Sequence, residues 1–404
     1  MEPHPIRLAV EDDLHRSRLT VFFRLLLALP HLVWLILWSI AALAAAVVAW
    51  IAALVTAQVP GGLHRFLAAY VRYATHVRAF LFLAANPFPG FTGREGSYPI
   101  DVEIAEPVRQ NRWTIFFRPI LALPALLLST TFTGGGRGGG IGTVGTAGLL
   151  GWFASLVRAR MPEGLRGLLA YSLRYAAQTS AYLFLLTGRY PDADPAEPAL
   201  ERPLDHPVRL RVEDDLRRSR LTVLFRLLLF LPHAVWLLLW GILAFLGAIA
   251  NWFVALVTGR PAGSLHRFLA RYLGYWLHVS SFLYLVANPF PGFTGRQGSY
   301  PVDIEVAPPA RQNRWKTAFR LILAFPALLI AGALGNALSL VALFGWFVGL
   351  ILGRMPRGLR NLGVFALRYQ AQVVAYLWIL TDRYPYSGPS PELGPAPAPV
   401  PEPI

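Results

Sequence analysis

Long apolar runs with few acidic residues constrain the fold of this chain more than any other feature. They occupy residues 31–56, 63–85, 233–258 and 265–287. Each run is long enough to cross a hydrocarbon core of about 30 Å, which needs roughly 20 helical residues. With 55% hydrophobic and only 15% charged residues overall, the chain is predicted to be an integral membrane protein.

The sequence also repeats itself. Residues 207–236 restate residues 5–34, and the loop NPFPGFTGRxGSYP occurs at residues 86–99 and again at 288–301. Within each half, a Phe-Arg pair followed by proline, a tryptophan and a Gly/Pro turn recur in the same order. Such periodicity is typical of a chain built from copies of one unit. The predicted organisation is repeat 1 at 1–98, repeat 2 at 99–190, a linker at 191–206, repeat 3 at 207–300, repeat 4 at 301–386 and a disordered Pro-rich tail at 387–404.

Each repeat is expected to contain the same elements. It opens on a short segment of alternating polarity, such as residues 100–104, whose period of two favours a half-buried strand. A Phe-Arg elbow, a long apolar helix, a Gly/Pro turn and a second helix follow. The predicted fold class is therefore mainly α and integral to the membrane, with four parallel repeats, about eight spans and a small β layer formed by all four strands on one membrane side.

The elbow is predicted to lie in the membrane interface. In the first repeat, the stretch from Leu19 to Thr56 contains Arg24 and Pro30, and one straight helix of that length would far exceed the membrane core. Because proline interrupts the hydrogen-bond ladder of a helix, we expect a bend there, with the span starting at His31 and the arginine at head-group level. The elbow arginines are Arg24, Arg118, Arg226 and Arg320.

The second helices carry the only polar signal inside the apolar runs. At 100° per residue, positions 65, 69, 72 and 76 share one face, so they form a stripe. The residues of this polar stripe, with their equivalents in the other repeats, are Arg65, Arg72, His76, Arg174, Gln178, Arg271, His278, Asn361, Arg368 and Gln372.

Three roles for the polar stripe remain open. It could line an interior or water-filled path, form the wet face of an interfacial helix, or bond structurally to the backbone and to neighbouring strands. In each case we expect it to face protein or water rather than lipid tails. The expected partners of its arginines are backbone carbonyls, head groups, a bound anion, or strand-layer acids such as Asp101 or Glu213.

Several kinds of chemistry find no support. The chain has no cysteine, its nine histidines form no HExxH-like ligand spacing, and no acidic residue falls inside a predicted span, so carboxylate-driven proton transfer has no groups to use. The run TGGGRGGGIG at 133–142 has no P-loop context and is read as a flexible insertion. We expect no enzymatic activity, no cofactor and no bound metal.

The net charge of +15 predicts attraction to anionic lipid head groups rather than to nucleic acid. Positive residues concentrate in the strand-bearing segments, which places these segments and both termini in the cytoplasm of a multi-pass protein of the plasma membrane. The hairpin turns would then lie on the opposite side. No removable signal peptide is expected, and the oligomeric state is left open.

The repeated unit resembles the bacterial, actinobacterial-type membrane family known as domain of unknown function 4389. The likeness rests on the strand-plus-elbow opening, LALPH at 27–31, the tryptophan with its Gly/Pro hairpin, and the ending YLFLLTGRYP at 182–191. The resemblance implies a multi-pass membrane protein and no known activity or site. The NPFPGF endings depart from the RYP pattern, so the first and third repeats are expected to be the more diverged. The expected function is a non-enzymatic scaffold or partner-binding membrane component; the alternative is a transporter or channel for an anionic or amphipathic solute.

Overall fold

The computed structural model describes residues 4–134, 141–195 and 206–389. It divides into two compact units, Met1–Asp192 and Ala193–Ile404, which correspond to the two halves of the duplicated sequence. The centre of the Gly-rich run, most of the predicted linker and most of the predicted tail lie outside the described residues.

Unit 1 begins with a strand and a helical hairpin, and then repeats that order. Its elements are β1 (Ile6–Val10), α1 (Arg18–Phe22), α2 (Arg24–Thr56), α3 (Gly61–Leu81), β2 (Ile100–Ile104), α4 (Arg112–Phe116), α5 (Arg118–Leu121), α6 (Leu123–Thr133), α7 (Thr143–Arg158) and α8 (Glu163–Leu183).

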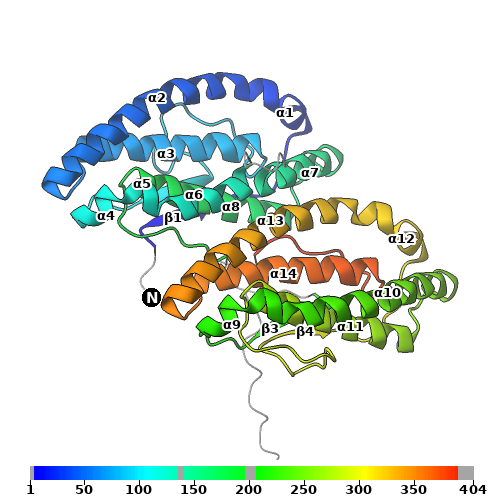
Figure 1. Cartoon of the computed structure of the whole chain (residues 1–404). Coiled ribbons are helices and arrows are strands. Elements are labelled where there is room, and N and C mark those ends of the chain that lie inside the picture. Colours follow the sequence, from blue (N-terminus) through cyan, green and yellow to red (C-terminus); the bar gives the residue numbers. More distant parts are fainter. Residues whose placement is uncertain (1–3, 135–140, 196–205, 390–404) are drawn as a thin grey trace, which may run out of the picture. The chain divides into compact units, whose positions relative to one another are not determined.

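Unit 2 has the same order, with an unbroken long helix in its second hairpin (Figure 1). Its elements are β3 (Val208–Val212), α9 (Arg220–Leu224), α10 (Arg226–Thr258), α11 (Gly263–Leu283), β4 (Val302–Val306), α12 (Arg314–Ala318), α13 (Arg320–Leu352) and α14 (Arg357–Leu377).

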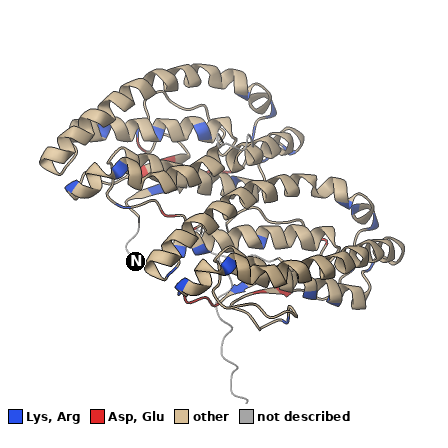
Figure 2. Ribbon diagram, viewed as in Figure 1, with Lys and Arg blue, Asp and Glu red and all other residues tan. Residues whose placement is uncertain are grey.

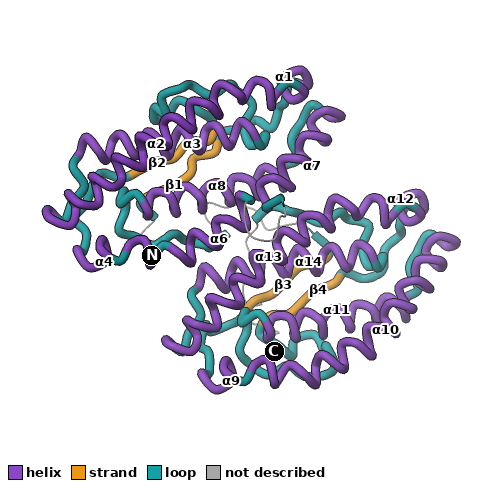
Figure 3. Tube along the Cα trace, turned by 45° about the horizontal axis from the view of Figure 1, so that its top comes forward, coloured by secondary structure: helices purple, strands orange, loops and turns teal. Residues whose placement is uncertain are grey.

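The four strands form two sheets, not the single layer expected from the sequence. β1 pairs with β2 and β3 with β4, each antiparallel, with Leu8 opposite Val102 in the first sheet and Leu210 opposite Ile304 in the second. A two-stranded sheet is marginal alone, so each one needs support from helices. β1 and β2 pack on α3 and α8, and Figure 3 shows the orange strands between the traces of those helices.

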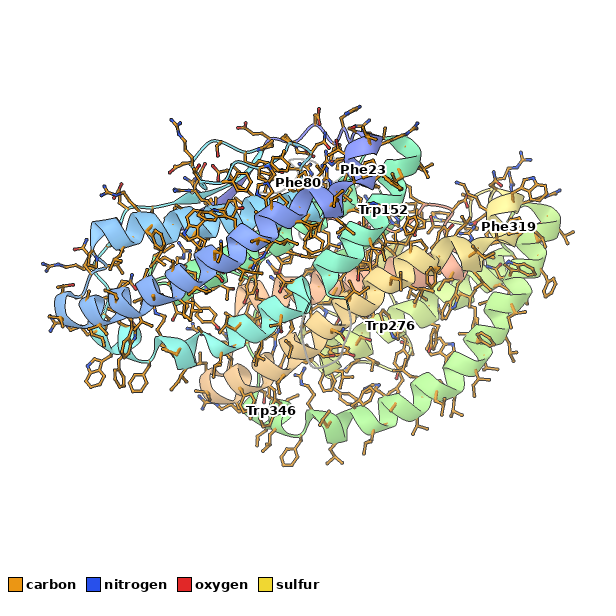
Figure 4. The ribbon with its side chains drawn as sticks, turned by 90° about the horizontal axis from the view of Figure 1, so that it is seen from above. Phe23, Phe80, Trp152, Trp276, Phe319 and Trp346 are labelled. Carbon is orange, nitrogen blue, oxygen red and sulfur yellow. The ribbon has the colours of Figure 1, made fainter. Side chains whose placement is uncertain are left out.

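Reciprocal contacts relate the two hairpins of unit 1. The indole of Trp152 on α7 donates to the carbonyl of Val21 on α1 at 3.0 Å, and the indole of Trp50 on α2 donates to that of Ile115 on α4 at 2.9 Å. Figure 4 shows Trp152 near Phe23, which marks the α1–α2 junction. Because α1 leads into α2 and α4 leads through α5 toward α7, these contacts make the two long helical segments antiparallel.

The predicted bend at proline is wrong for α2. The helix runs unbroken through Pro30, and the break falls at Phe23, whose φ of −89° and ψ of 7° separate α1 from α2. Because Pro30 has no backbone N–H, the helix lacks only the hydrogen bond from this position to the carbonyl of Leu26. Figure 1 shows α2 as a curved helix. Arg24, its first residue, bonds to carbonyls at the end of α3 and in the loop that follows.

Three helices in the described residues are long and apolar enough to cross a membrane, namely α2, α10 and α13. The second helices are amphipathic instead: about half of the residues of α3 are buried within unit 1, and its Arg72 bonds to β2 and to the loop before it. Figure 2 shows the arch of α2 free of charge between its ends. The structure therefore supports a membrane protein without confirming eight spans.

Candidate functional site

The polar stripe meets the strands. Nε2 of His76 lies 2.7 Å from Oδ1 of Asp101 on β2, and His278 and Asp303 form the same contact at 2.8 Å in unit 2. The equivalent glutamines bond to the other strand of each sheet: Nε2 of Gln178 donates to the carbonyl of Ile6 at 3.0 Å. In this way α3 and α8 each hold one strand.

Gln372 repeats the contact of Gln178 in unit 2. Its Nε2 donates to the carbonyl of Val208 at 3.1 Å, and its Oε1 accepts from the backbone N–H of Tyr386 at 3.0 Å. The corresponding oxygen of Gln178 accepts from the N–H of Asp192 at 2.9 Å. Each glutamine thus ties a strand to the segment that follows the second hairpin.

The remaining stripe residues divide into engaged and exposed side chains. Arg72 donates to the carbonyl of Val102 at 2.9 Å and to Glu95 at 2.5 Å. Asn361 donates to Asp194 at 2.7 Å, and Arg368 donates to the carbonyl of Gly388 at 2.6 Å. Arg174 is buried over the ring of Tyr171, whereas Arg65 and Arg271 are exposed.

Asp101 is the electrostatic centre of this arrangement in unit 1. Burial tends to raise its pKa, but bonds from His76, Gly96 N–H and Val102 N–H together lower it below 3.8. Asp303 has the same shift for the same reasons. The ring of Tyr98 stacks on His76 with centroids 5.0 Å apart. Because the carboxylate joins a helix, a loop and a strand, its bonds fix the sheet to α3.

The elbow arginines are buried within the protein, and their depth relative to the head groups stays a prediction. Arg24, Arg118, Arg226 and Arg320 are at most 2% exposed. Arg24 Nη1 donates to the carbonyls of Phe80 at 2.6 Å and Ala85 at 3.0 Å, and its guanidinium lies 4.5 Å from the Phe80 ring centroid. Each arginine binds the end of its own hairpin, because carbonyls there lack helical N–H partners.

Sequence reasoning missed one further buried arginine in each unit. Arg16, which is fully buried, pairs with Asp12 at 2.8 Å and donates to the carbonyls of Leu83 and Ala84. Arg218 and Asp214 repeat the pair. The signal was present in the repeated motif EDDLxRSRLTV, whose carboxylate and guanidinium are four residues apart.

The repeated NPFPGF loop clasps the first helix of its hairpin. The ring of His31 lies between Phe88 and Phe91, with centroids 4.4 and 4.3 Å away, and its Nδ1 is 2.8 Å from the Tyr73 hydroxyl. Gly93 has a φ of +59°, and a Cβ there would meet the Ala69 carbonyl oxygen at 2.1 Å. His233, Phe290 and Phe293 repeat the aromatic contact in unit 2. The loop's sequence is therefore explained by packing.

The polar side chains of the site can also be compared with arrangements that hold a metal or activate a nucleophile. Among the described residues, no three His, Cys, Asp or Glu side chains gather as a metal site. The two buried His–Asp pairs have no hydroxyl nucleophile in hydrogen-bond contact among the bonds described for them. The engaged residues of the polar stripe and the elbow arginines join strands, loops and helix ends.

Burial lowers the pKa of two equivalent histidines that precede the first strand of each unit, His4 and His206, and the effect is large at His206. His206 precedes β3, is 3% exposed and accepts the Val208 N–H at Nδ1. Burial lowers its pKa from 6.5 to about 4, partly offset by the carbonyl oxygen of Val208 at 3.1 Å from Nδ1, while Arg368 and Arg383 lower it further. Between these pH values the unfolded chain binds the extra proton, so the free energy of unfolding falls as pH falls, by about 1.4 kcal/mol per pH unit.

We therefore expect the detergent-solubilised protein to melt at a lower temperature at pH 5 than at pH 7. His206→Asn keeps an acceptor for Val208 without the titration, so it should reduce this difference. His15→Asn, at an exposed histidine, is the control and should leave the difference unchanged. Equal pH dependence in His206→Asn and the unmodified chain would refute the assignment.

Comparison with known proteins identifies the repeated hairpin. Residues 18–92, 220–294 and 314–387 match one family, described as Domain of unknown function (DUF4389). Each match starts within or at an elbow helix and runs through a hairpin. Both NPFPGF repeats match, so the expectation that they are the more diverged copies is not supported. No curated protein and no solved structure matches the chain.

Proposed function

Because the chain belongs to the family described as Domain of unknown function (DUF4389), whose description assigns no activity, we propose from its geometry that it is a non-enzymatic membrane scaffold that binds a protein partner. The observation that carries this proposal is that most residues of the polar stripe bond within the protein. Its engaged side chains bond to strands, loops and helix ends. They are thus committed to internal structure rather than to a solute path.

The partner surface that fits this proposal is the outer face of each sheet. In unit 1, Arg7 pairs with Glu103 at 3.1 Å while their side chains stay 62% and 49% exposed. In unit 2, Glu305 meets Arg211 at 2.7 Å. Exposed ion pairs contribute little to stability, and a mixed-charge rigid surface suits recognition of a polar partner with complementary charge.

We place this scaffold in the plasma membrane with both termini in the cytoplasm, because its positive residues lie in the strand-bearing segments and the rule that positive residues stay inside applies to segments near membrane helices. We also propose that residues 99–190, the predicted repeat 2, are a fourth copy of the unit that the family matches three times. It is supported by the same order of strand, elbow helix and hairpin.

A photo-reactive amino acid at position 7 tests the partner proposal. We expect a discrete cross-linked protein adduct in native membranes, weakened when Glu103 is changed to Arg, and no such adduct from the matched position 43 on the apolar face of α2. Vesicles containing the purified protein should pass chloride and an anionic dye no faster than empty vesicles. Saturable, protein-dependent flux would instead support a transporter or channel.

A further inference from the structure

We propose that each unit lies in the plane of one membrane leaflet rather than crossing the bilayer. The long outer helices are immersed among the lipid tails, and the sheet, the hairpin turns and the elbows all face the same aqueous side. The partner is a leaflet rich in anionic phospholipid. This inference rests on the proposed membrane embedding and is independent of the proposed protein partner.

Backbone bonds join the segments that eight spans would separate. Two bonds link the α7–α8 turn to the segment after β1: Arg16 N–H donates to the carbonyl of Ala159 at 2.9 Å, and Met161 N–H donates to that of Leu14 at 2.8 Å. Gln110 N–H, after β2, donates to the carbonyl of Ala57 in the α2–α3 turn at 2.8 Å. A turn and a segment on opposite sides of a membrane cannot bond in this way.

Unit 2 contains the same three bonds. They join Arg218 to Gly353, Met355 to Leu216, and Gln312 to Gly259, at 2.8 to 2.9 Å. The two copies of the unit therefore agree. In each, the turn of one hairpin lies beside the strand-bearing segment of the other, so crossings with turns outside and strands inside do not fit the fold.

An orientation in which the long helices of the whole unit cross the bilayer conflicts with the position of the strands. With α2 crossing the bilayer, its two ends would lie on opposite sides, and the chain would return from the end of α3 to the start of α4 along β2. That strand would then cross the hydrocarbon as part of an open two-stranded sheet. The Arg7–Glu103 ion pair would lie level with the tails. Lipid-exposed sheet edges do not occur in the bilayer core, and charges there are costly.

The symmetry of the unit leads to the in-plane orientation. The antiparallel register centred on Leu8 and Val102 defines a local twofold axis perpendicular to the sheet, and the reciprocal indole bonds of Trp50 and Trp152 obey it. Antiparallel helices related by such an axis lie nearly perpendicular to it. When the axis is normal to the membrane, equivalent residues of both hairpins share one depth and the long helices run along the surface.

The exposed apolar surface extends farther than a crossing requires. On α2 it reaches from Leu25, 73% exposed, to Val55, 69% exposed, a distance of about 45 Å along a helix against a core of about 30 Å. On α10 it reaches from Leu227 to Val257, 73% and 71% exposed. A tilted crossing helix would bury more of this apolar length than an upright one. A helix lying in the leaflet buries the whole apolar length at one depth.

Exposed arginines at both ends of the unit complete the argument. Arg18 donates to the carbonyl of Val157 at the end of α7, and Arg112 donates to that of Val55 at the end of α2. A cation is favourable at a helix C-terminus. In the plane of one leaflet, both ends meet the same layer of head groups, where each arginine near an anionic surface gains about 1 kcal/mol. This is why the turns as well as the strands are rich in arginine.

Sidedness of single cysteines tests the orientation directly, because the chain has none of its own. The substitutions Glu11→Cys and Gly62→Cys mark the two ends of α2 in unit 1, and no neighbour obstructs a Cβ at Gly62. Glu213→Cys and Ser264→Cys mark the same places in unit 2. A membrane-impermeant maleimide is applied to intact host cells and to inverted vesicles. We expect positions 11 and 62 to react in the same preparation, and positions 213 and 264 to react together in one preparation.

Leu43→Cys serves as the depth marker and control. Leu43 is 65% exposed near the middle of α2, so this cysteine should resist the maleimide until the membrane is dissolved. A nitroxide there should report a depth of about 5–10 Å below the head-group boundary, not the bilayer midplane. Reaction of positions 11 and 62 in different preparations, or a label at the midplane, overturns the proposal. Release of the protein by alkaline carbonate would instead contradict the membrane embedding itself.

Discussion

Arg24→Met is expected to lower the free energy of unfolding of unit 1 by about 3 to 6 kcal/mol. The change removes two charge-assisted bonds to the carbonyls of Phe80 and Ala85 and one to Asn86. Hydrogen bonds to charged groups contribute about 1.5–3 kcal/mol each, so the two bonds to buried carbonyls account for the expected loss. Methionine fills most of the space but offers no donor, so the end of α3 loses its attachment to α2.

The measurement is the melting temperature of the solubilised protein, followed by size-exclusion chromatography after heating. The melting temperature of Arg24→Lys should lie between those of Arg24→Met and the unmodified protein, since an ammonium keeps the charge but cannot reproduce the planar fork of the guanidinium. Arg18→Met is the matched control: this arginine is exposed and holds one carbonyl, so its loss should cost under about 1 kcal/mol. If the melting temperature of Arg24→Met were no lower than that of Arg18→Met, the bonds of Arg24 to the end of its hairpin would not stabilise the fold.

Asp101→Ala should destabilise unit 1 by a similar amount, about 3 to 6 kcal/mol. The carboxylate accepts bonds from two buried donors, His76 and the Val102 N–H, and from the part-buried Gly96 N–H. A buried donor left unsatisfied costs about 1–3 kcal/mol, and a part-buried one costs less because water can reach it. Glu103→Ala, two residues along the same strand, removes only an exposed ion pair and should change the free energy of unfolding by less than about 1 kcal/mol.

The lowered pKa of Asp101 gives this prediction a second readout. A carboxyl whose folded pKa lies below 3.8 contributes stability above that pH and loses it as pH falls further. The unmodified protein should therefore lose stability below about pH 4 more steeply than Asp101→Asn, which retains an acceptor but does not titrate. Indistinguishable acid profiles would show that the pair with His76 is not a structural contact.

Much of the local structure follows from sequence alone. The period-two segments at 6–10 and 100–104 are strands, and the long apolar runs are helices, because side-chain spacing decides which face can be buried. The duplication of halves matches the two compact units. The apolar surface of α2 is equally readable, since nearly every residue between Leu25 and Val55 is apolar.

Spacing could not supply the contacts between distant residues. The end of α1 meets α7 through Val21 and Trp152, 131 positions apart, and Arg24 reaches carbonyls 56 and 61 positions away. An arginine beside an apolar run satisfies its donors equally well at head groups or at orphan carbonyls, so its sequence context does not choose between them. Packing makes that choice.

The same distinction governs the relation to the membrane. Sequence predicted that long helices enter a membrane, because their apolar side chains are too numerous to be buried within narrow helical hairpins, and three helices of the described residues are long and apolar enough to do so. An apolar helix has the same composition whether it crosses a bilayer or lies within one leaflet. Only the tertiary structure decided between these orientations, because backbone bonds between the turns and the strand-bearing segments require both to share one side.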